Sequence, residues 1–194
     1  MQLAWVTDIH LDFLTGEQTD RFFAEIAATG ADGVVVTGDI ALATTIVGHL
    51  RRMGRAEKKP IWFVLGNHDF NGGSIPAVRA AVTERSREGQ VAWLPAADVV
   101  ELSSRTALVG HDGWGDARLG NVDGTPVLLT DFVVIAELAG VDRATLTTRL
   151  RRLGDEAAAN MARVLPQALE SHEHVLVLTH VPPFREACWH RGGY

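Results

Sequence analysis

The sequence contains a single cysteine, Cys188, among its 194 residues. One thiol cannot form an intrachain disulfide, which excludes the disulfide-stabilised scaffold of many small secreted proteins and favours a reducing compartment. No general base is paired with Cys188 in the sequence pattern, so we do not expect it to act as a nucleophile.

Long apolar runs and an excess of positive charge are also missing. The longest apolar runs are far too short to cross a bilayer, and no basic segment followed by a separate apolar region marks a signal peptide. The formal net charge of −6 disfavours binding to polyanions such as nucleic acids. We therefore expect a cytoplasmic protein that associates with neither membranes nor nucleic acids, and nothing in the sequence indicates an oligomeric state.

What the chain does have is the length and composition of one globular domain. Its 46% apolar and 22% charged residues are ordinary for such a domain, and the length allows a sizeable core. No repeat, low-complexity tract or linker divides it, so residues 1–194 are predicted to form a single domain.

Four short apolar runs, each followed by a polar motif, are the most informative feature. Such runs are typical of strands buried on both faces of a sheet. The runs are Leu3–Val6, Val34–Val36, Ile61–Leu65 and Val175–Leu178. The motifs that follow them are Asp8-Ile9-His10, Gly38-Asp39, Gly66-Asn67-His68-Asp69 and His180-Val181-Pro182-Pro183.

The position of these motifs predicts a metal site. Ligands of open α/β sheets bind just beyond the carboxyl ends of the strands, so the four loops should converge at one edge. Aspartates and histidines gathered there would repel one another or lack partners without a cation. Mixed oxygen and nitrogen ligands suit Mn, Fe or Zn better than Ca.

The rest of the chain alternates strand and helix, which indicates the α/β class. After Gly89, three short β-rich segments suggest adjacent, partly antiparallel strands of a second sheet, and a loop follows. The three segments are Val91–Leu94, Val99–Leu102 and Thr106–Val109, and the loop is Gly110–Pro126. Helices are predicted at Glu17–Thr29, Thr44–Arg55, Leu128–Leu138 and Asp142–Glu170, and a further helix is predicted to begin at the cap Ser74 and run to about Arg87. Asp142 is the predicted N-cap of the last helix, and Pro166 should kink or break it.

The order of the polar motifs resembles that of the calcineurin-like metallophosphoesterase family. Its pattern is D-x-H, then G-D, then G-N-H-D or G-N-H-E, then H, then G-H-x-H. The first four blocks occur here in order between Asp8 and His180. The resemblance implies a four-layer α/β/β/α sandwich with a βαββαβ metal-binding core.

The fifth block, which supplies two further histidine ligands in the family, is absent. Only Phe184–Tyr194 follow the last predicted strand and its loop, with no capping strand or helix. We therefore expect a C-terminally truncated form of a longer protein, missing the C-terminal part of the fold.

The resemblance also implies a site that holds two metal ions. Asp8 and His10 would bind the first ion, and Asp39 would bridge both. Asn67 and His180 would bind the second ion. The ions would clamp the phosphoryl group while a metal-bound hydroxide attacks the phosphorus.

His68, next to a predicted ligand, would by this resemblance protonate or stabilise the leaving oxygen. The function implied is hydrolysis of small phosphoesters, with diesters slightly preferred because the motifs carry no basic cluster for a dianionic phosphate. Two alternatives are a nuclease of the same family, which the acidic balance disfavours, and a non-catalytic scaffold. The missing fifth block supports the scaffold, whereas retention of His68 and the other site residues opposes it.

Three further polar residues are candidates for supporting roles. Asp12 and Asp69 could accept hydrogen bonds from ligating imidazoles, with Asp12 near His10, although Asp12 could equally be a loop or capping residue. His111 could contact a leaving group, although a glycine-rich turn anchored by Trp114 explains that loop at least as well.

Overall fold

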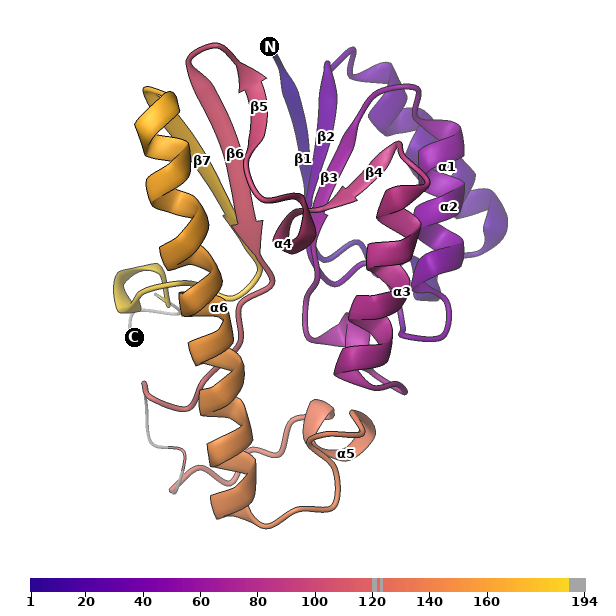
Figure 1. The fold of residues 1–194 in the computed structure, drawn as a ribbon. Helices are drawn as coiled ribbons and strands as arrows, with labels where there is room; N and C mark the ends of the chain where they lie inside the picture. Colours follow the sequence, from indigo (N-terminus) through magenta and orange to yellow (C-terminus); the bar gives the residue numbers. More distant parts are fainter. Residues whose placement is uncertain (120–121, 123, 189–194) are drawn as a thin grey trace.

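The computed structural model describes residues 1–119, 122 and 124–188 and contains two sheets that face each other (Figure 1). The first sheet is parallel throughout, in the order β1-β2-β3-β4. The second has the order β5-β6-β7, with β5 antiparallel and β7 parallel to β6. The strands are β1 (Leu3–Val6), β2 (Gly33–Thr37), β3 (Ile61–Val64), β4 (Val91–Trp93), β5 (Val100–Ser103), β6 (Thr106–His111) and β7 (His174–Thr179).

Helices cover the outer side of each sheet. Figure 1 shows α1, α2 and α3 along the first sheet and the long α6 along the second. The α-helices are α1 (Gly16–Ala28), α2 (Ile46–Ala56), α3 (Ile75–Arg87), α4 (Leu94–Ala97), α5 (Asp131–Val134) and α6 (Arg143–Ser171). Three 3-10 turns are η1 (Leu11–Phe13), η2 (His68–Phe70) and η3 (Arg185–Cys188).

The alternating direction of side chains along the strands divides the buried apolar residues into three layers. Successive side chains of a strand point to opposite faces. On β2, Val34 and Val36 join the core beneath the helices, whereas Val35 joins the core between the sheets. On β3, Phe63 faces the helices, and Trp62 faces the second sheet. Both central strands are buried throughout, as the sequence predicts.

The buried side chains of the second sheet are likewise divided between the layer that faces the other sheet and the layer that faces a helix. Leu108 of β6 packs between the sheets, while Ala107 and Val109 pack against Val164 and Ala168 of α6. Helix, sheet, sheet and helix therefore form four layers, which confirms the predicted α/β/β/α sandwich.

Side-chain caps explain where the helices begin. The predicted caps are confirmed at Ser74, which accepts a hydrogen bond from the backbone N–H of Ala77, and at Asp142, which accepts one from Thr145. Each cap satisfies a backbone donor that the first helical turn leaves free. Helix α6 continues through Pro166 to Ser171, so the predicted break there is wrong; its burial against the second sheet holds it together.

Two other expectations about the elements are wrong. The segment at Val91 belongs to the first sheet, parallel to β3, because α3 returns the chain to that sheet in a βαβ connection. Only Asp131–Val134 of the predicted helix Leu128–Leu138 is helical. Leu128 is 69% exposed, so this end of the segment gains little burial to hold a longer helix.

The outermost strands are less buried than their sequences suggest. Trp5 on β1 is 70% exposed, and Leu176 and Val177 on β7 are 43% and 45% exposed. Within the part of the chain that is described, each of these strands pairs with one neighbour only. Part of the predicted loop Gly110–Pro126 and the chain end after Cys188 lie outside the described residues. Within those residues, no helix combines the length and apolar character needed to cross a membrane.

Candidate metal centre

The first two polar motifs run side by side beyond the ends of β1 and β2. The backbone N–H of Asp8 donates to the carbonyl of Gly38 (3.1 Å), and that of His10 donates to the carbonyl of Asp39 (3.0 Å). These bonds extend the pairing of the two strands into the loops. They bring Asp8 and His10 next to Asp39, which is far from them in the sequence.

The same three residues have an unusual backbone conformation. Asp8, His10 and Asp39 have φ angles of 51°, 40° and 51°, in the left-handed region that side chains disfavour. Strain of this kind persists only where the surrounding structure imposes it, and it gathers at functional sites. Backbone strain at three predicted ligands supports a functional role for these loops.

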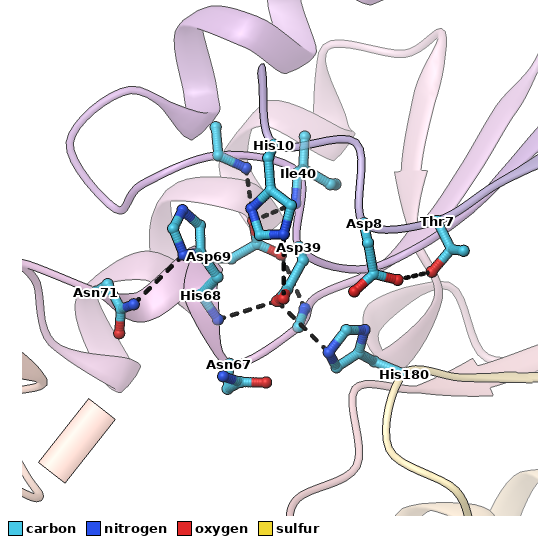
Figure 2. Close-up of polar contacts among 12 residues, drawn as sticks. Thr7, Asp8, His10, Asp39, Ile40, Asn67, His68, Asp69, Asn71 and His180 are labelled. Carbon is cyan, nitrogen blue, oxygen red and sulfur yellow. Dashed lines mark hydrogen bonds and ion pairs between the residues drawn. The ribbon is translucent and has the colours of Figure 1, made fainter. Parts of the chain in front are cut away.

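Asp39 lies at the centre of the site (Figure 2). One carboxylate oxygen is 3.8 Å from Nε2 of His10, and the other is 3.5 Å from Nε2 of His180. Potential ligand atoms of Asp8, Asp39 and His180 all lie within 4.8 Å of one another. Two carboxylates and an imidazole at this spacing are suited to a divalent cation.

The orientation of His180 fits a metal ligand. Its Nδ1 lies 2.8 Å from the carbonyl of Thr37 and can only donate there. The lone pair of the neutral ring is then on Nε2, which faces Asp39. A backbone acceptor on the second ring nitrogen is the usual way in which proteins hold a ligating histidine. Nδ1 of His10 is buried and lacks a hydrogen-bond partner among the described residues.

His68 belongs to a second group, together with His10 and Asp12. Its Nε2 lies 3.2 and 3.3 Å from the two oxygens of Asp12, and Nδ1 lies 3.4 Å from the amide nitrogen of Asn71. The expectation that Asp12 supports His10 is therefore wrong. The short turn η1 carries the Asp12 carboxylate across to His68, where it stabilises a proton on Nε2.

Asn67 is oriented by a residue that sequence reasoning missed. Its amide nitrogen donates to both oxygens of Asp131, at 3.0 and 3.2 Å. Figure 2 shows the amide oxygen of Asn67 turned toward His180. Asp131 lies at the start of α5, far along the chain and outside any motif. The only feature of the sequence that points to Asp131 is that it is a single acidic residue within an apolar stretch.

Asp69 holds loops together instead of supporting an imidazole. It is fully buried and accepts hydrogen bonds from the backbone N–H groups of Ile40 (2.7 Å), Ala41 (2.8 Å) and Gly66 (2.8 Å). Burial raises the pKa of Asp69 to about 8, against the lowering by these donors. Its predicted role beside a ligand is wrong, because its oxygens are used to join the second motif to the third.

His111 does not line the cavity that contains Asp39 and His68, and its contact with a leaving group stays a prediction. It is buried at the end of β6, and its Nδ1 accepts a hydrogen bond from the backbone N–H of Gly113 (3.1 Å). Desolvation lowers the pKa of His111, which favours the neutral ring. Its neighbour Asp112 accepts from the backbone of Leu65 and the indole of Trp93, which ties the two sheets together beneath the site.

Two glycines allow the close approach of the loops. A Cβ atom on Gly38 would lie 2.6 Å from the backbone nitrogen of Gly66, and one on Gly66 would lie 2.1 Å from Oδ1 of Asp39. Neither contact is possible without displacing the site. The close packing of the loops therefore requires glycine at both positions.

A two-sheet sandwich with acids and histidines gathered at its strand ends indicates a metal-dependent enzyme. The model of the calcineurin-like phosphoesterase family matches residues 1–194, and the chain belongs to that family. The family uses divalent metal ions, and the two side-chain groups above are candidate binding residues for them.

Solved structures share the fold. A phosphopantetheinyl hydrolase from Mycobacterium tuberculosis superposes with a TM-score of 0.70 at 18% identity, over 96% of this chain and 70% of the other. The protein TT1561 of Thermus thermophilus gives a TM-score of 0.61 at 13% identity, over 99% of this chain and 72% of the other. A comparison with curated proteins finds no significant match.

Proposed function

We propose that this protein hydrolyses phosphodiester bonds with the help of two metal ions. Asp8, His10 and Asp39 would hold the first ion, and Asp39, Asn67 and His180 the second. The position of Asp39 between the imidazoles of His10 and His180 carries the proposal. Asp8, Asp39 and His180 form one group with ligand atoms within 4.8 Å of one another, so members of both ligand sets lie together.

The ions would supply Lewis acidity, which activates water and neutralises charge on the phosphoryl oxygens. Hydrolysis joins the water oxygen to phosphorus and breaks the bond to the leaving oxygen, which departs as an alcohol after gaining a proton. His68 is the donor of that proton in this proposal. Asp12 holds the ring by accepting from Nε2, so the transferred proton would come from Nδ1, which lies 3.4 Å from the amide nitrogen of Asn71.

The preference for diesters rests on charge. Asp39 and His68 line a cavity of about 670 Å³, and none of the described residues around it is lysine or arginine. A monoester carries a second negative charge that such a cavity would leave without a protein counterion, whereas a diester carries one. The same lack of cations disfavours a nuclease, which needs a basic groove. The missing fifth block supports a non-catalytic scaffold, but the presence of His68 with its partners Asp12 and Asn71 favours catalysis.

The proposal is tested by hydrolysis of a chromogenic phosphodiester. Chelator-treated protein should be inactive, and activity should return with Mn²⁺. The variant Asp39→Asn should stay inactive at every Mn²⁺ concentration, because it removes charge from both ligand sets. Absence of turnover by the Mn²⁺-loaded protein toward diesters and monoesters would contradict the proposal, and turnover of monoesters alone would contradict the diester preference.

Asp131 should matter for metal affinity, although it is not proposed as a ligand. In Asp131→Ala, the amide of Asn67 loses the acceptor that directs its oxygen, and metal affinity should fall about 10–100-fold. Dissociation constants from competition with a chromophoric chelator measure this. Asp20→Ala on α1, a 69% exposed carboxylate that pairs with Arg52, is the control and should bind metal normally. Equal affinities in the two variants would contradict the role of Asp131.

A further inference from the structure

We infer that the phosphoester carries an uncharged, apolar group, which binds to an apolar wall beside the metal centre formed by Phe13, Leu42, Leu129 and Val134. This inference names the substrate class for the activity proposed above and rests on it. The wall lines the same cavity as Asp39 and His68, so a group bound to the phosphorus would contact it.

The charges around the cavity favour an uncharged group. Its acidic residues are Asp39 and Asp131, and the described lining contains no lysine or arginine. A second phosphate or a carboxylate that lies away from the metal ions would meet the carboxylate of Asp131 and no protein cation among the described lining residues. The volume of about 670 Å³ is in the range of pockets that enclose small organic ligands.

The wall has apolar surface that the fold does not bury. Phe13 is 75% exposed, Leu129 47% and Val134 37%. Val127 and Leu128, which precede Leu129 in the sequence, are also exposed, at 62% and 69%. Apolar side chains gathered next to polar catalytic groups are typical of ligand sites.

The wall is also held in place relative to the metal centre. Asp131 lies between Leu129 and Val134 and is bound to Asn67 through both of its oxygens. The backbone N–H of Gly72 donates to the carbonyl of Val134 (3.2 Å). The same hydrogen bonds that orient the predicted ligand therefore fix the distance from the apolar side chains to the phosphorus.

A second cavity of similar size does not compete for this role. It has a volume of about 690 Å³, lies between α3 and α6, and contains none of the predicted ligands. Its residues Arg79 and Arg152 already pair with Glu156. Its other acid, Glu137, accepts hydrogen bonds from Ser74 and from the backbone of Ile75.

A series of alkyl p-nitrophenyl phosphates, from methyl to octyl, tests the inference by activity. The reacting bond and the leaving group are the same throughout, so the chain length changes only the contact with the wall. We expect kcat/KM to rise about threefold to fourfold per methylene until the wall is covered. A chain of equal length that ends in a carboxylate should lose that gain. A rate that does not depend on chain length, or the same rise for the carboxylate series, would overturn the inference.

Two variants of the apolar wall should reduce the increase of kcat/KM with alkyl chain length. Val134→Thr keeps the shape of the side chain and adds a hydroxyl, and Leu129→Asn replaces apolar surface at similar volume. Leu169→Asn on α6, which is 57% exposed and does not line the cavity, is the matched control and should retain the full dependence on chain length. An unchanged dependence in both wall variants would place the apolar contact elsewhere and overturn the inference.

Binding gives a readout that does not need turnover. Calorimetry with methyl to octyl phosphonates, which are not hydrolysed, should show affinity for the Mn²⁺-loaded protein rising with chain length by a similar factor. If no ester is cleaved while this affinity rises, the proposed hydrolysis fails and the apolar specificity stands. If esters are cleaved but neither rate nor affinity depends on the chain, the specificity fails and the hydrolase stands.

Discussion

Replacement of His68 by alanine is expected to lower kcat by about 10²–10⁴ for a diester with an alkoxide leaving group, because general acid assistance has this magnitude. The loss should be much smaller for p-nitrophenolate, which is stable as an anion and needs little protonation. The size of the effect should therefore increase with the basicity of the leaving group. Single-turnover rates for the two kinds of substrate measure this difference.

Metal binding separates this role from that of a ligand. His68→Ala should bind metal with nearly the affinity of the unmodified protein, because Nε2 of His68 is bound to Asp12 and not to Asp39. His174→Ala, at a 59% exposed position on β7, is the control and should keep full activity. An equal loss of rate for both leaving groups, together with a loss of metal, would show that His68 is a ligand and not an acid.

The replacement Gly66→Ala is expected to abolish tight metal binding and to destabilise the protein by about 1–3 kcal/mol, as insertion of a methyl group into a packed site does. The added Cβ would lie 2.1 Å from Oδ1 of Asp39 and 2.8 Å from Cε1 of His180. Both neighbours are predicted ligands held by hydrogen bonds, so neither can move away without losing its position. Chelator competition and denaturant midpoints measure the two effects.

The matched control is Gly48→Ala on α2. A Cβ atom on Gly48 would meet nothing within 4 Å. Alanine is favoured over glycine inside a helix by about 0.5–1 kcal/mol, so this variant should be more stable and bind metal normally. Retention of native metal affinity by Gly66→Ala would mean that the loops can separate, contrary to the close packing at Asp39.

The sequence predicts those parts of the site that directly follow the ends of the strands. Runs such as Val34–Val36 and Ile61–Leu65 are apolar throughout, and only a strand buried on both faces requires that. Parallel strands of one sheet end at one edge, so the residues that follow them had to meet. This reasoning places Asp8, Asp39 and Asn67 in one region without knowledge of any distance.

The remaining features depend on geometry that spacing does not specify. Asp12 is two residues from His10 and lies in one group with His10 and His68, yet its carboxylate hydrogen-bonds to His68. Asp131 reaches Asn67 only because the chain after β6 returns beneath the first sheet. The exposure of Trp5 on β1 likewise depends on strand order, which composition does not encode.

The two sheets differ in how far apart their partners lie in the sequence, and this has a consequence for assembly of the protein. Strands β1 to β4 pair with their neighbours in chain order, whereas β7 must find β6 after the whole segment 112–173. Pairing over such a separation is slow because a long loop must be closed first. During synthesis the first sheet can form early, carrying Asp8, Asp39 and Asn67. His180 joins them only when β7 has docked, so the centre should be completed in the final step of folding.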